Sequence, residues 1–231
     1  MVVDVKPHQK FRGIYTATFE DGTEKLVTKN LAPGKSVYGE RLVSWQDIEY
    51  RVWDPFRSKL AAAIMKGLGT VPIKPNHRVL YLGAASGTTA SHISDMVGIN
   101  GQVYCVEFSA RSIRELVNNV CVFRPNMTPL LEDARMPQRY AMFVSTVDDI
   151  YCDIAQPEQT KILADNADLF LKNDGWVILA VKSQSIDVTK QPSEVYKNEI
   201  KTLKARGFTI TDVVNLEPFE KAHVMVVAKF E

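Results

Sequence analysis

The chain has 231 residues, 45% hydrophobic and 24% charged, which is the composition of an ordinary globular protein with a sizeable core. Its formal net charge of +1 argues against a protein that binds nucleic acid alone through phosphate contacts. The apolar runs are too short for a membrane segment, and the N-terminus has no hydrophobic signal core. We therefore expect a cytoplasmic protein. Its three cysteines, Cys105, Cys121 and Cys152, have no metal-like spacing and are expected to be reduced thiols.

The first fifty residues predict a small antiparallel sheet. Glu20–Thr23 has the composition of a hairpin turn between two β-rich runs, and a second pair of runs follows. The four expected strands cover 11–19, 25–31, 37–45 and 48–53. The Asp54–Pro55 step then ends the pattern. We therefore expect a small N-terminal β domain over 1–54 and a second domain over 55–231.

The second domain alternates between helical and strand patterns. Helices are predicted at 57–67, 88–97, 112–120, 159–171 and 193–206, and strands at 78–82, 102–108, 127–131, 148–152, 175–181, 208–216 and 222–230. Strands separated by helices indicate a mostly parallel sheet covered on both faces. The connection between the last two strands is too short for a parallel crossover. The pattern thus predicts an α/β fold with a seven-stranded Rossmann-like sheet and an antiparallel last strand.

A glycine loop follows the first strand of this domain. In Val79–Thr89 an apolar run ends at Gly83, small residues follow, and a helix can begin at Thr88. Such a loop lets the backbone approach a ligand beside a helix N-terminus. Glu107, which ends the next strand, has about the separation expected of an acid that binds a ribose, roughly 20 residues. The pattern predicts an adenosine-type cofactor, but the glycine spacing and the last strand disfavour a nicotinamide dehydrogenase.

Polar residues also follow the other strands of the sheet. We expect Glu107 to accept the ribose hydroxyls, Phe108 to stack on adenine, and Asp133 with Ala134 to reach the adenine amino group. Asp153 is either a turn cap or a catalytic group that faces the crevice. Lys182 directly ends a buried strand, where proximity to a crevice favours proton chemistry.

Two further residues complete a candidate catalytic set. Lys59 lies on the helix before the first strand of the sheet, and His223 opens the last strand. Each alone is better explained by a surface role. Together, Lys59, Asp153, Lys182 and His223 form an acid–base cluster that no structural argument requires.

Over nearly its whole length the sequence resembles the fibrillarin family of ribose 2′-O-methyltransferases. The resemblance is carried by the blocks Arg57–Leu60, Leu80–His92, Asp153–Pro157, Ala180–Ser183, Ser185–Thr189 and Leu216–His223. Because the Gly/Arg-rich N-terminal extension of eukaryotic members is missing, the chain looks like the archaeal form.

The resemblance implies S-adenosylmethionine as cofactor and no metal. The implied cofactor-binding residues are Gly83, Ala85, Gly87, Thr88, Thr89, Glu107, Phe108, Asp133, Ala134, Asp153, Ile154, Ala155 and Gln156. It also implies catalysis by the set defined above, within a box C/D ribonucleoprotein that contains a Nop-family scaffold protein, a kink-turn-binding protein and a guide RNA. The substrates would be rRNA and tRNA.

For the mechanism, we expect Lys182 to remove the proton of the ribose 2′-hydroxyl and Asp153 to orient Lys182. The role of His223, in holding the nucleotide or sharing the proton, stays open. Two other functions stay open as well. One is methylation of a protein side chain such as a glutamine amide, which the Asp153–Gln156 loop disfavours. The other is a non-catalytic scaffold subunit, which would have no use for the acid–base set.

Overall fold

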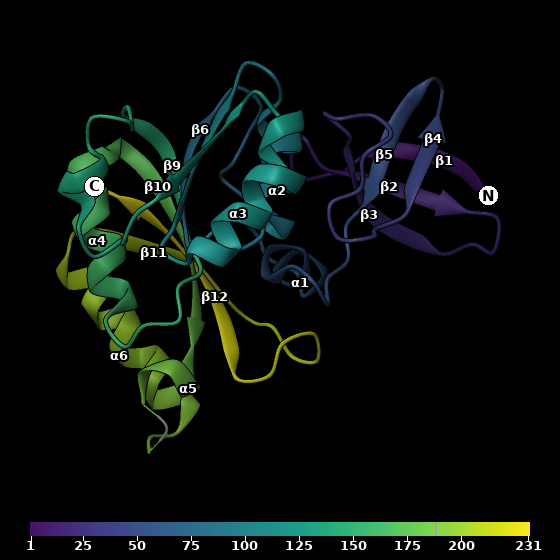
Figure 1. The fold of residues 1–231 in the computed structure, drawn as a ribbon. Coiled ribbons are helices and arrows are strands. Elements are labelled where there is room, and N and C mark those ends of the chain that lie inside the picture. Colours follow the sequence, from purple (N-terminus) through teal and green to yellow (C-terminus); the bar gives the residue numbers. More distant parts are fainter. Residues whose placement is uncertain (188) are drawn as a thin grey trace.

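The computed structural model describes residues 1–187 and 189–231, so Val188, in the Ser185–Thr189 block, lies outside the described residues. The chain builds two β-sheets, and the larger one carries helices on both faces (Figure 1). The N-terminus lies on the smaller sheet and the C-terminus on the larger one (Figure 1).

The smaller sheet is antiparallel, with the strand order β1-β2-β3-β5-β4. Its strands are β1 (Val2–Pro7), β2 (Tyr15–Phe19), β3 (Glu24–Lys29), β4 (Leu42–Trp45) and β5 (Ile48–Val52). The predicted hairpin around Glu20–Thr23 is confirmed, with Gly22 in the left-handed region at a φ of +78°. The sequence does not predict β1, because its side chains are exposed or half-buried and give no clear apolar face.

The larger sheet has the strand order β11-β12-β10-β9-β6-β7-β8. Its strands are β6 (Arg78–Leu82), β7 (Gln102–Glu107), β8 (Met127–Leu131), β9 (Val147–Cys152), β10 (Leu171–Lys182), β11 (Phe208–Asn215) and β12 (His223–Phe230). Strands β6 to β10 pair in parallel, while β12 lies between β10 and β11 and runs antiparallel to both. The predicted seven-stranded, mostly parallel sheet with an antiparallel last strand is therefore confirmed.

Helices cover both faces of this sheet. They are α1 (Lys59–Met65), α2 (Thr88–Val97), α3 (Ala110–Asn119), α4 (Gln159–Phe170), α5 (Ser183–Ile186) and α6 (Pro192–Ala205), with 3-10 turns at Cys121–Phe123 and Pro137–Tyr140. Helices α1, α2 and α3 lie on the face toward the smaller sheet, and α4 and α6 on the opposite face (Figure 1). Each face has its own hydrophobic cluster, as expected for strands buried on both sides.

Capping serines move two helix starts away from their predicted positions. Helix α1 begins at Lys59 because Ser58 is extended and its Oγ accepts a 3.5 Å hydrogen bond from the amide of Ala61. Ser109 likewise caps α3 and accepts a hydrogen bond from the amide of Ser112. The four-residue helix α5 is not predicted from the sequence.

A buried carboxylate joins the two sheets. Asp95, on α2, accepts hydrogen bonds from Thr28 of β3, the amide of Leu31, Arg51 of β5 and Arg124. Arg51 and Arg124 are almost fully buried, with exposed fractions of 0% and 1%. A buried charge of this kind is tolerated only when it is paired and hydrogen-bonded, so the contact has a fixed geometry.

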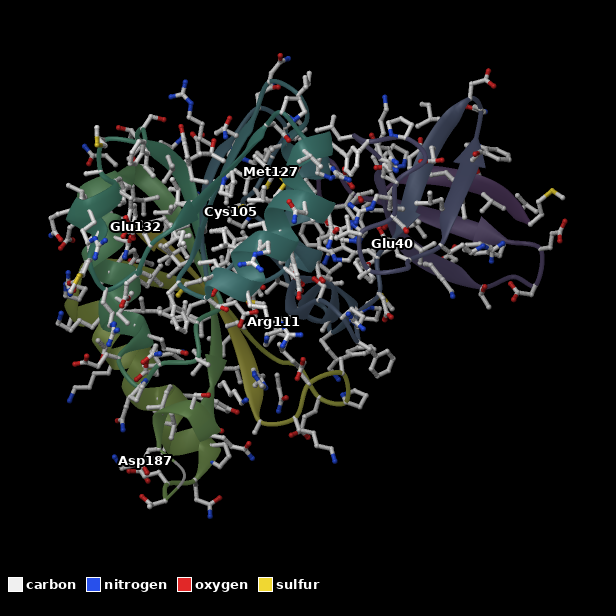
Figure 2. All side chains as sticks on the ribbon, viewed as in Figure 1. Glu40, Cys105, Arg111, Met127, Glu132 and Asp187 are labelled. Carbon is white, nitrogen blue, oxygen red and sulfur yellow. The ribbon has the colours of Figure 1, made fainter. Side chains whose placement is uncertain are left out.

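The same junction contains a second acid and a shared apolar core. Glu40, placed between the smaller sheet and α2 in Figure 2, accepts a 2.6 Å hydrogen bond from Nε of Arg51. Phe11, Ile14 and Trp53 belong to the hydrophobic cluster that includes the buried residues of α1 and α2. The two sheets thus share one hydrophobic cluster, while the smaller sheet also has a separate cluster around Phe19 and Tyr50. A domain boundary at residue 54 stays a prediction.

The cysteines form no disulfide among the described residues. Cys105 and Cys152 are buried in β7 and β9, as expected for core thiols, whereas Cys121 is half-buried in a 3-10 turn. In the described part of the chain, every helix is too short or too polar to span a bilayer.

Candidate active site

The loop after β6 needs glycine at two positions. Gly83 has a φ of +82°, and a Cβ there would lie 2.5 Å from the carbonyl oxygen of Asp153. Gly87 has a φ of +95°, and a Cβ there would lie 2.5 Å from Cδ1 of Leu116. Only glycine adopts this backbone without steric cost and leaves room for both neighbours. The loop therefore packs closely against the segment that follows β9.

Glu107, at the end of β7, fixes the glycine loop. Its Oε2 accepts a 2.9 Å hydrogen bond from the amide of Ala85, and its Oε1 accepts a 2.8 Å hydrogen bond from the amide of Ser109. Ala85 has a φ of +48°, a conformation that needs support from its surroundings in a residue with a side chain. A carboxylate offers about four acceptor positions, so Glu107 retains capacity for ligand hydroxyl groups.

A pocket of about 240 Å³ opens at the carboxyl ends of β6, β7, β8 and β9. The predicted cofactor residues that line it are Gly83, Ala85, Glu107, Phe108, Asp133, Ala134, Asp153, Ile154, Ala155 and Gln156. Phe108 is 71% exposed, so its ring can serve as a stacking platform. Ligands of open α/β sheets bind at this edge.

Four residues that the sequence does not indicate complete the pocket wall: Val106, Glu132, Arg135 and Ile162. Val106 and Glu132 directly adjoin predicted residues and could have been found by extending those segments along the chain. Ile162 comes from α4, which only the fold brings to the pocket.

Gly87, Thr88 and Thr89 do not line this pocket in the structure. They begin α2, which has Gly87 at its N-cap and no side-chain capping bond. The buried hydroxyl of Thr89 donates a 2.9 Å hydrogen bond to Oγ of Ser58, the residue that caps α1. Thr89 therefore connects the helix of the glycine loop to the helix that carries Lys59.

Asp133 is held as an ionised acceptor. Nε of Arg135 donates to both carboxylate oxygens at 3.0 and 2.9 Å, and the amide of Arg135 donates to Oδ1. These hydrogen bonds lower the pKa of Asp133. The neighbouring Ala134 is buried, and its carbonyl accepts a 2.8 Å hydrogen bond from Asn166. Asp133 and Ala134 thus form a well-ordered wall on the β8 side.

Lys59 and Asp153 form an ion pair at the edge of the pocket. Nζ of Lys59, the first residue of α1, lies 2.9 Å from Oδ2 of Asp153. The two side chains are 21% and 24% exposed, so the pair is only partly solvated. In this structure Asp153 is hydrogen-bonded to Lys59, whereas the sequence predicts that it orients Lys182.

Lys182 and His223 are direct neighbours, because they face each other across the antiparallel strands β10 and β12. Nδ1 of His223 lies 2.7 Å from the carbonyl oxygen of Lys221. A carbonyl only accepts hydrogen bonds, so Nδ1 carries the proton and Nε2 of the neutral ring is an acceptor.

Burial lowers the pKa of His223, and so does the positive charge of Lys59, while the bond to Lys221 and the charges of Glu220 and Asp153 oppose the shift. The four predicted catalytic residues therefore meet as two pairs at one edge of the sheet. Among the residues that the structure describes, no three histidine, cysteine or acidic side chains are grouped to hold a metal ion.

The sheet order, the glycine loop after β6 and the carboxylate that ends β7 fit an adenosine-type cofactor. Comparison with relatives and solved structures identifies the class as S-adenosylmethionine-dependent methyltransferases. Within this class the chain belongs to the fibrillarin family, whose family model matches residues 5–231.

Individual relatives cover almost the entire chain. A fibrillarin-like rRNA/tRNA 2′-O-methyltransferase of Pyrobaculum aerophilum is 58% identical over 229 residues, which cover 99% of this chain and 97% of the relative. Aeropyrum pernix fibrillarin, solved with natively bound S-adenosyl-L-methionine, is 51% identical, with a TM-score of 0.93 and 99% of each chain covered. A fibrillarin solved in complex with Nop5p is 42% identical, with a TM-score of 0.86, and covers 98% of this chain and 100% of its own.

Proposed function

We propose that this chain is the catalytic subunit of a box C/D ribonucleoprotein and methylates ribose 2′-oxygens in rRNA and tRNA. The observation that carries the proposal is a set of two pairs: Lys59 is bonded to Asp153, which lines the pocket, and Lys182 faces His223 across β10 and β12. A ribose 2′-hydroxyl is a weak nucleophile at neutral pH and needs a positioned base. A non-catalytic scaffold would need neither the base nor the pocket.

S-adenosylmethionine would supply a methyl group on a positively charged sulfur, which becomes a neutral thioether when the methyl passes to the 2′-oxygen. The pocket suits such a ligand, because Glu107 keeps free acceptor positions and the exposed ring of Phe108 lies in the pocket wall. We assign Glu107 to the ribose hydroxyls, Phe108 to the adenine face, and Asp133 with Ala134 to the adenine edge. The uncapped start of α2, at Gly87 to Thr89, is assigned to the carboxylate end of the cofactor through its N–H groups.

The segment from Asp153 to Gln156 forms the remaining wall, and within it Asp153 faces both the pocket and Lys59. We assign Lys59 to hold this carboxylate, which attracts the positively charged end of the cofactor. Lys182 takes the proton from the 2′-hydroxyl. His223, with Nε2 as an acceptor, is placed beside Lys182 to stabilise the ammonium group that results.

The chain would work with partners. A fibrillarin of 42% identity has been solved in complex with Nop5p, which supports a Nop-family scaffold protein for this chain. The net charge of +1 also favours partners that supply most of the contacts to RNA phosphates. A kink-turn-binding protein and a guide RNA, which selects the ribose, complete the proposed particle.

Substitutions of Lys182 test its role as base. Lys182→Arg keeps a positive charge, but a guanidinium is not deprotonated near neutral pH, so we expect it to fail as Lys182→Ala does. Both should slow methyl transfer by about 10²–10⁴-fold, the usual contribution of a general base. The measurement is single-turnover transfer of labelled methyl in the particle assembled with guide RNA and a Nop-family protein.

Lys197→Arg, on the exposed side of α6, is the matched control and should leave the rate unchanged. Equilibrium dialysis should show nearly unchanged cofactor affinity in all three variants. A wild-type rate in Lys182→Arg would exclude Lys182 as the base.

A further inference from the structure

A second pocket, with a volume of about 550 Å³, lies between the smaller sheet and α1. Its wall combines three cations with three aromatic side chains: Lys25, Arg41, Arg57, Tyr38, Trp53 and Phe56. None of these residues belongs to the set assigned above to catalysis or to the cofactor. Cations beside aromatic rings are the combination with which proteins bind single-stranded nucleic acid.

This pocket shares no lining residue with the cofactor pocket, but it lies beside segments that carry two of the catalytic candidates. Phe56 lies three residues before Lys59, the first residue of α1. Its ring makes an edge-to-face contact with Phe219, at 5.0 Å between ring centroids and an interplanar angle of 70°. Phe219 in turn lies four residues before His223. The segment that carries Lys59 therefore lines the second pocket, and the segment that carries His223 contacts this lining through Phe219.

The cations of the pocket make cation–π contacts with aromatic rings. The guanidinium of Arg57 lies 5.8 Å from the ring centroid of Tyr38, and that of Arg41 lies 4.7 Å from the centroid of Phe19. Lys25 Nζ approaches the same Phe19 ring at 5.9 Å. Such contacts hold the charges in place and leave N–H donors available for an anion.

The acids in the same wall are largely engaged elsewhere. The Glu40 carboxylate is bonded to the buried Arg51, and Oδ1 of Asp54 accepts a 2.9 Å hydrogen bond from the amide of Phe56. This hydrogen bond leaves Asp54 charged, so Asp54 and Glu24 stand against the three cations described above. The pocket thus keeps a positive balance, which suits a phosphate.

One observation points to a ligand with a flat ring. The ring of Phe56 is 63% exposed although it stands at the pocket wall. Trp53, which also lines the pocket, is 1% exposed, and its Nε1 has no hydrogen-bond partner among the described residues. Trp53 is stacked on His92 and forms part of the packed base of the pocket, so Phe56 supplies the ring that is exposed to a ligand.

We propose that this pocket binds a nucleotide of the substrate RNA strand next to the ribose that is methylated. Its base packs against Phe56, and its phosphate contacts Arg41 and Arg57. The inference rests on the proposed function, because it takes the substrate to be RNA. It assigns a second binding site to the junction between the smaller sheet and α1, so that the target ribose is held from two sides.

The test uses the assembled particle and three variants: Phe56→Leu, Phe56→Trp and the double variant Arg41→Ala with Arg57→Ala. Phe56→Leu should raise the KM for target RNA by about tenfold with little change in kcat, while Phe56→Trp restores the KM. The double variant should also raise the KM. It should reduce the slope of log KM against log salt concentration by about 0.7, as for one lost phosphate contact on a single strand.

Controls separate this inference from the proposed function. If the wild-type particle fails to methylate RNA, the proposed function itself is wrong. If the wild type is active and Phe56→Leu and the double variant share its KM and salt dependence, the second site is refuted. A fall in kcat without a change in KM would mean that Phe56 only supports the Phe219 loop. Loss of assembly with the Nop-family protein would make the pocket a protein interface, and either result overturns the proposal.

Discussion

At the scale of single residues, Glu107 combines a structural and a binding role. Its two oxygens hold the amides of Ala85 and Ser109, and the same carboxylate lines the pocket. Glu107 is only 7% exposed, so its position is set by the fold rather than by solvent. This explains how a ribose-binding acid can be ordered before any ligand arrives.

Substitution of Glu107 separates the two roles. Glu107→Ala should weaken S-adenosylmethionine binding by about 10–100-fold, because hydrogen bonds to a charged group contribute about 1.5–3 kcal/mol. Glu107→Gln keeps one acceptor oxygen and should lie between Glu107→Ala and the wild type. Isothermal titration calorimetry gives the dissociation constants, with Glu115→Ala on the exposed side of α3 as control. The ribose assignment fails if Glu107→Ala binds the cofactor as the wild type does.

At the scale of secondary-structure elements, one hydrogen bond couples α1 to α2. Thr89 Oγ1 donates to Oγ of Ser58, and Ser58 caps the helix that begins with Lys59. Helix α2, which follows the glycine loop, therefore fixes the start of α1, the helix that carries Lys59. Lys59 in turn holds Asp153 in the pocket wall.

Loss of this bond should affect turnover more than cofactor binding. Ser58→Ala removes the cap, which costs about 0.5–2 kcal/mol of stability, and frees the first turn of α1. We expect kcat to fall several-fold in Ser58→Ala and in Thr89→Val, while the dissociation constant for S-adenosylmethionine changes less than twofold. Thr89→Ser keeps the hydroxyl and should behave like the wild type. Equal kcat values in all four proteins would show that the coupling has no role in catalysis.

At the scale of the whole molecule, the two sheets are joined by a buried polar network that makes stability depend on pH. Thr28 donates its hydroxyl proton to Asp95, so it can only accept from Nδ1 of His92. Nε2 of His92 then accepts from the hydroxyl of Tyr38, whose pKa burial raises to about 12. Burial, and then the charges of Arg51 and Arg124, lowers the pKa of His92 well below its ordinary value.

Because His92 is neutral in the folded protein, acidification should lower the free energy of unfolding. Below about pH 6.5 the unfolded chain takes up a proton at His92 and the folded chain does not. The contribution of His92 to the free energy of unfolding should therefore be level above pH 7 and fall by up to about 1.4 kcal/mol per pH unit on acidification below pH 6.5. Burial also lowers the pKa values of His8 and His223, which act in the same direction.

Urea denaturation between pH 5 and pH 8 measures this dependence. His92→Gln removes the titrating group, so its slope below pH 6.5 should be smaller by about one proton, although the variant is less stable overall. An unchanged slope would mean that His92 is not the group that responds.

Much of this fold could be predicted from the sequence, because apolar residues repeat with a different period in strands and in helices. Strand β6, helix α2 and strand β8 begin and end at the predicted residues, since each is bounded by glycine, proline or polar residues. Most of the pocket follows from positions at strand ends. The pairing of Lys59 with Asp153 and the position of Ile162 in the pocket wall depend on how the helices pack on the sheet. The repeat of apolar residues along the sequence does not give this packing.

The buried junction was beyond prediction for the same reason. Arg51 and Asp95 stand in segments whose local pattern places charges on the surface, and only the docking of the two sheets buries them together. Strand β1 lacks a buried face of its own and forms by pairing with β2.

The central claim is methylation of a ribose 2′-oxygen, and one measurement tests it most directly. Labelled methyl transfer is followed in the assembled particle with two target RNAs, which differ only by a 2′-hydroxyl or a 2′-hydrogen at the selected nucleotide. We predict that label enters the first RNA, only when guide RNA and partner proteins are present, and does not enter the second. Label in the 2′-deoxy RNA at the same rate would contradict the claim, because the accepting atom would then not be the 2′-oxygen.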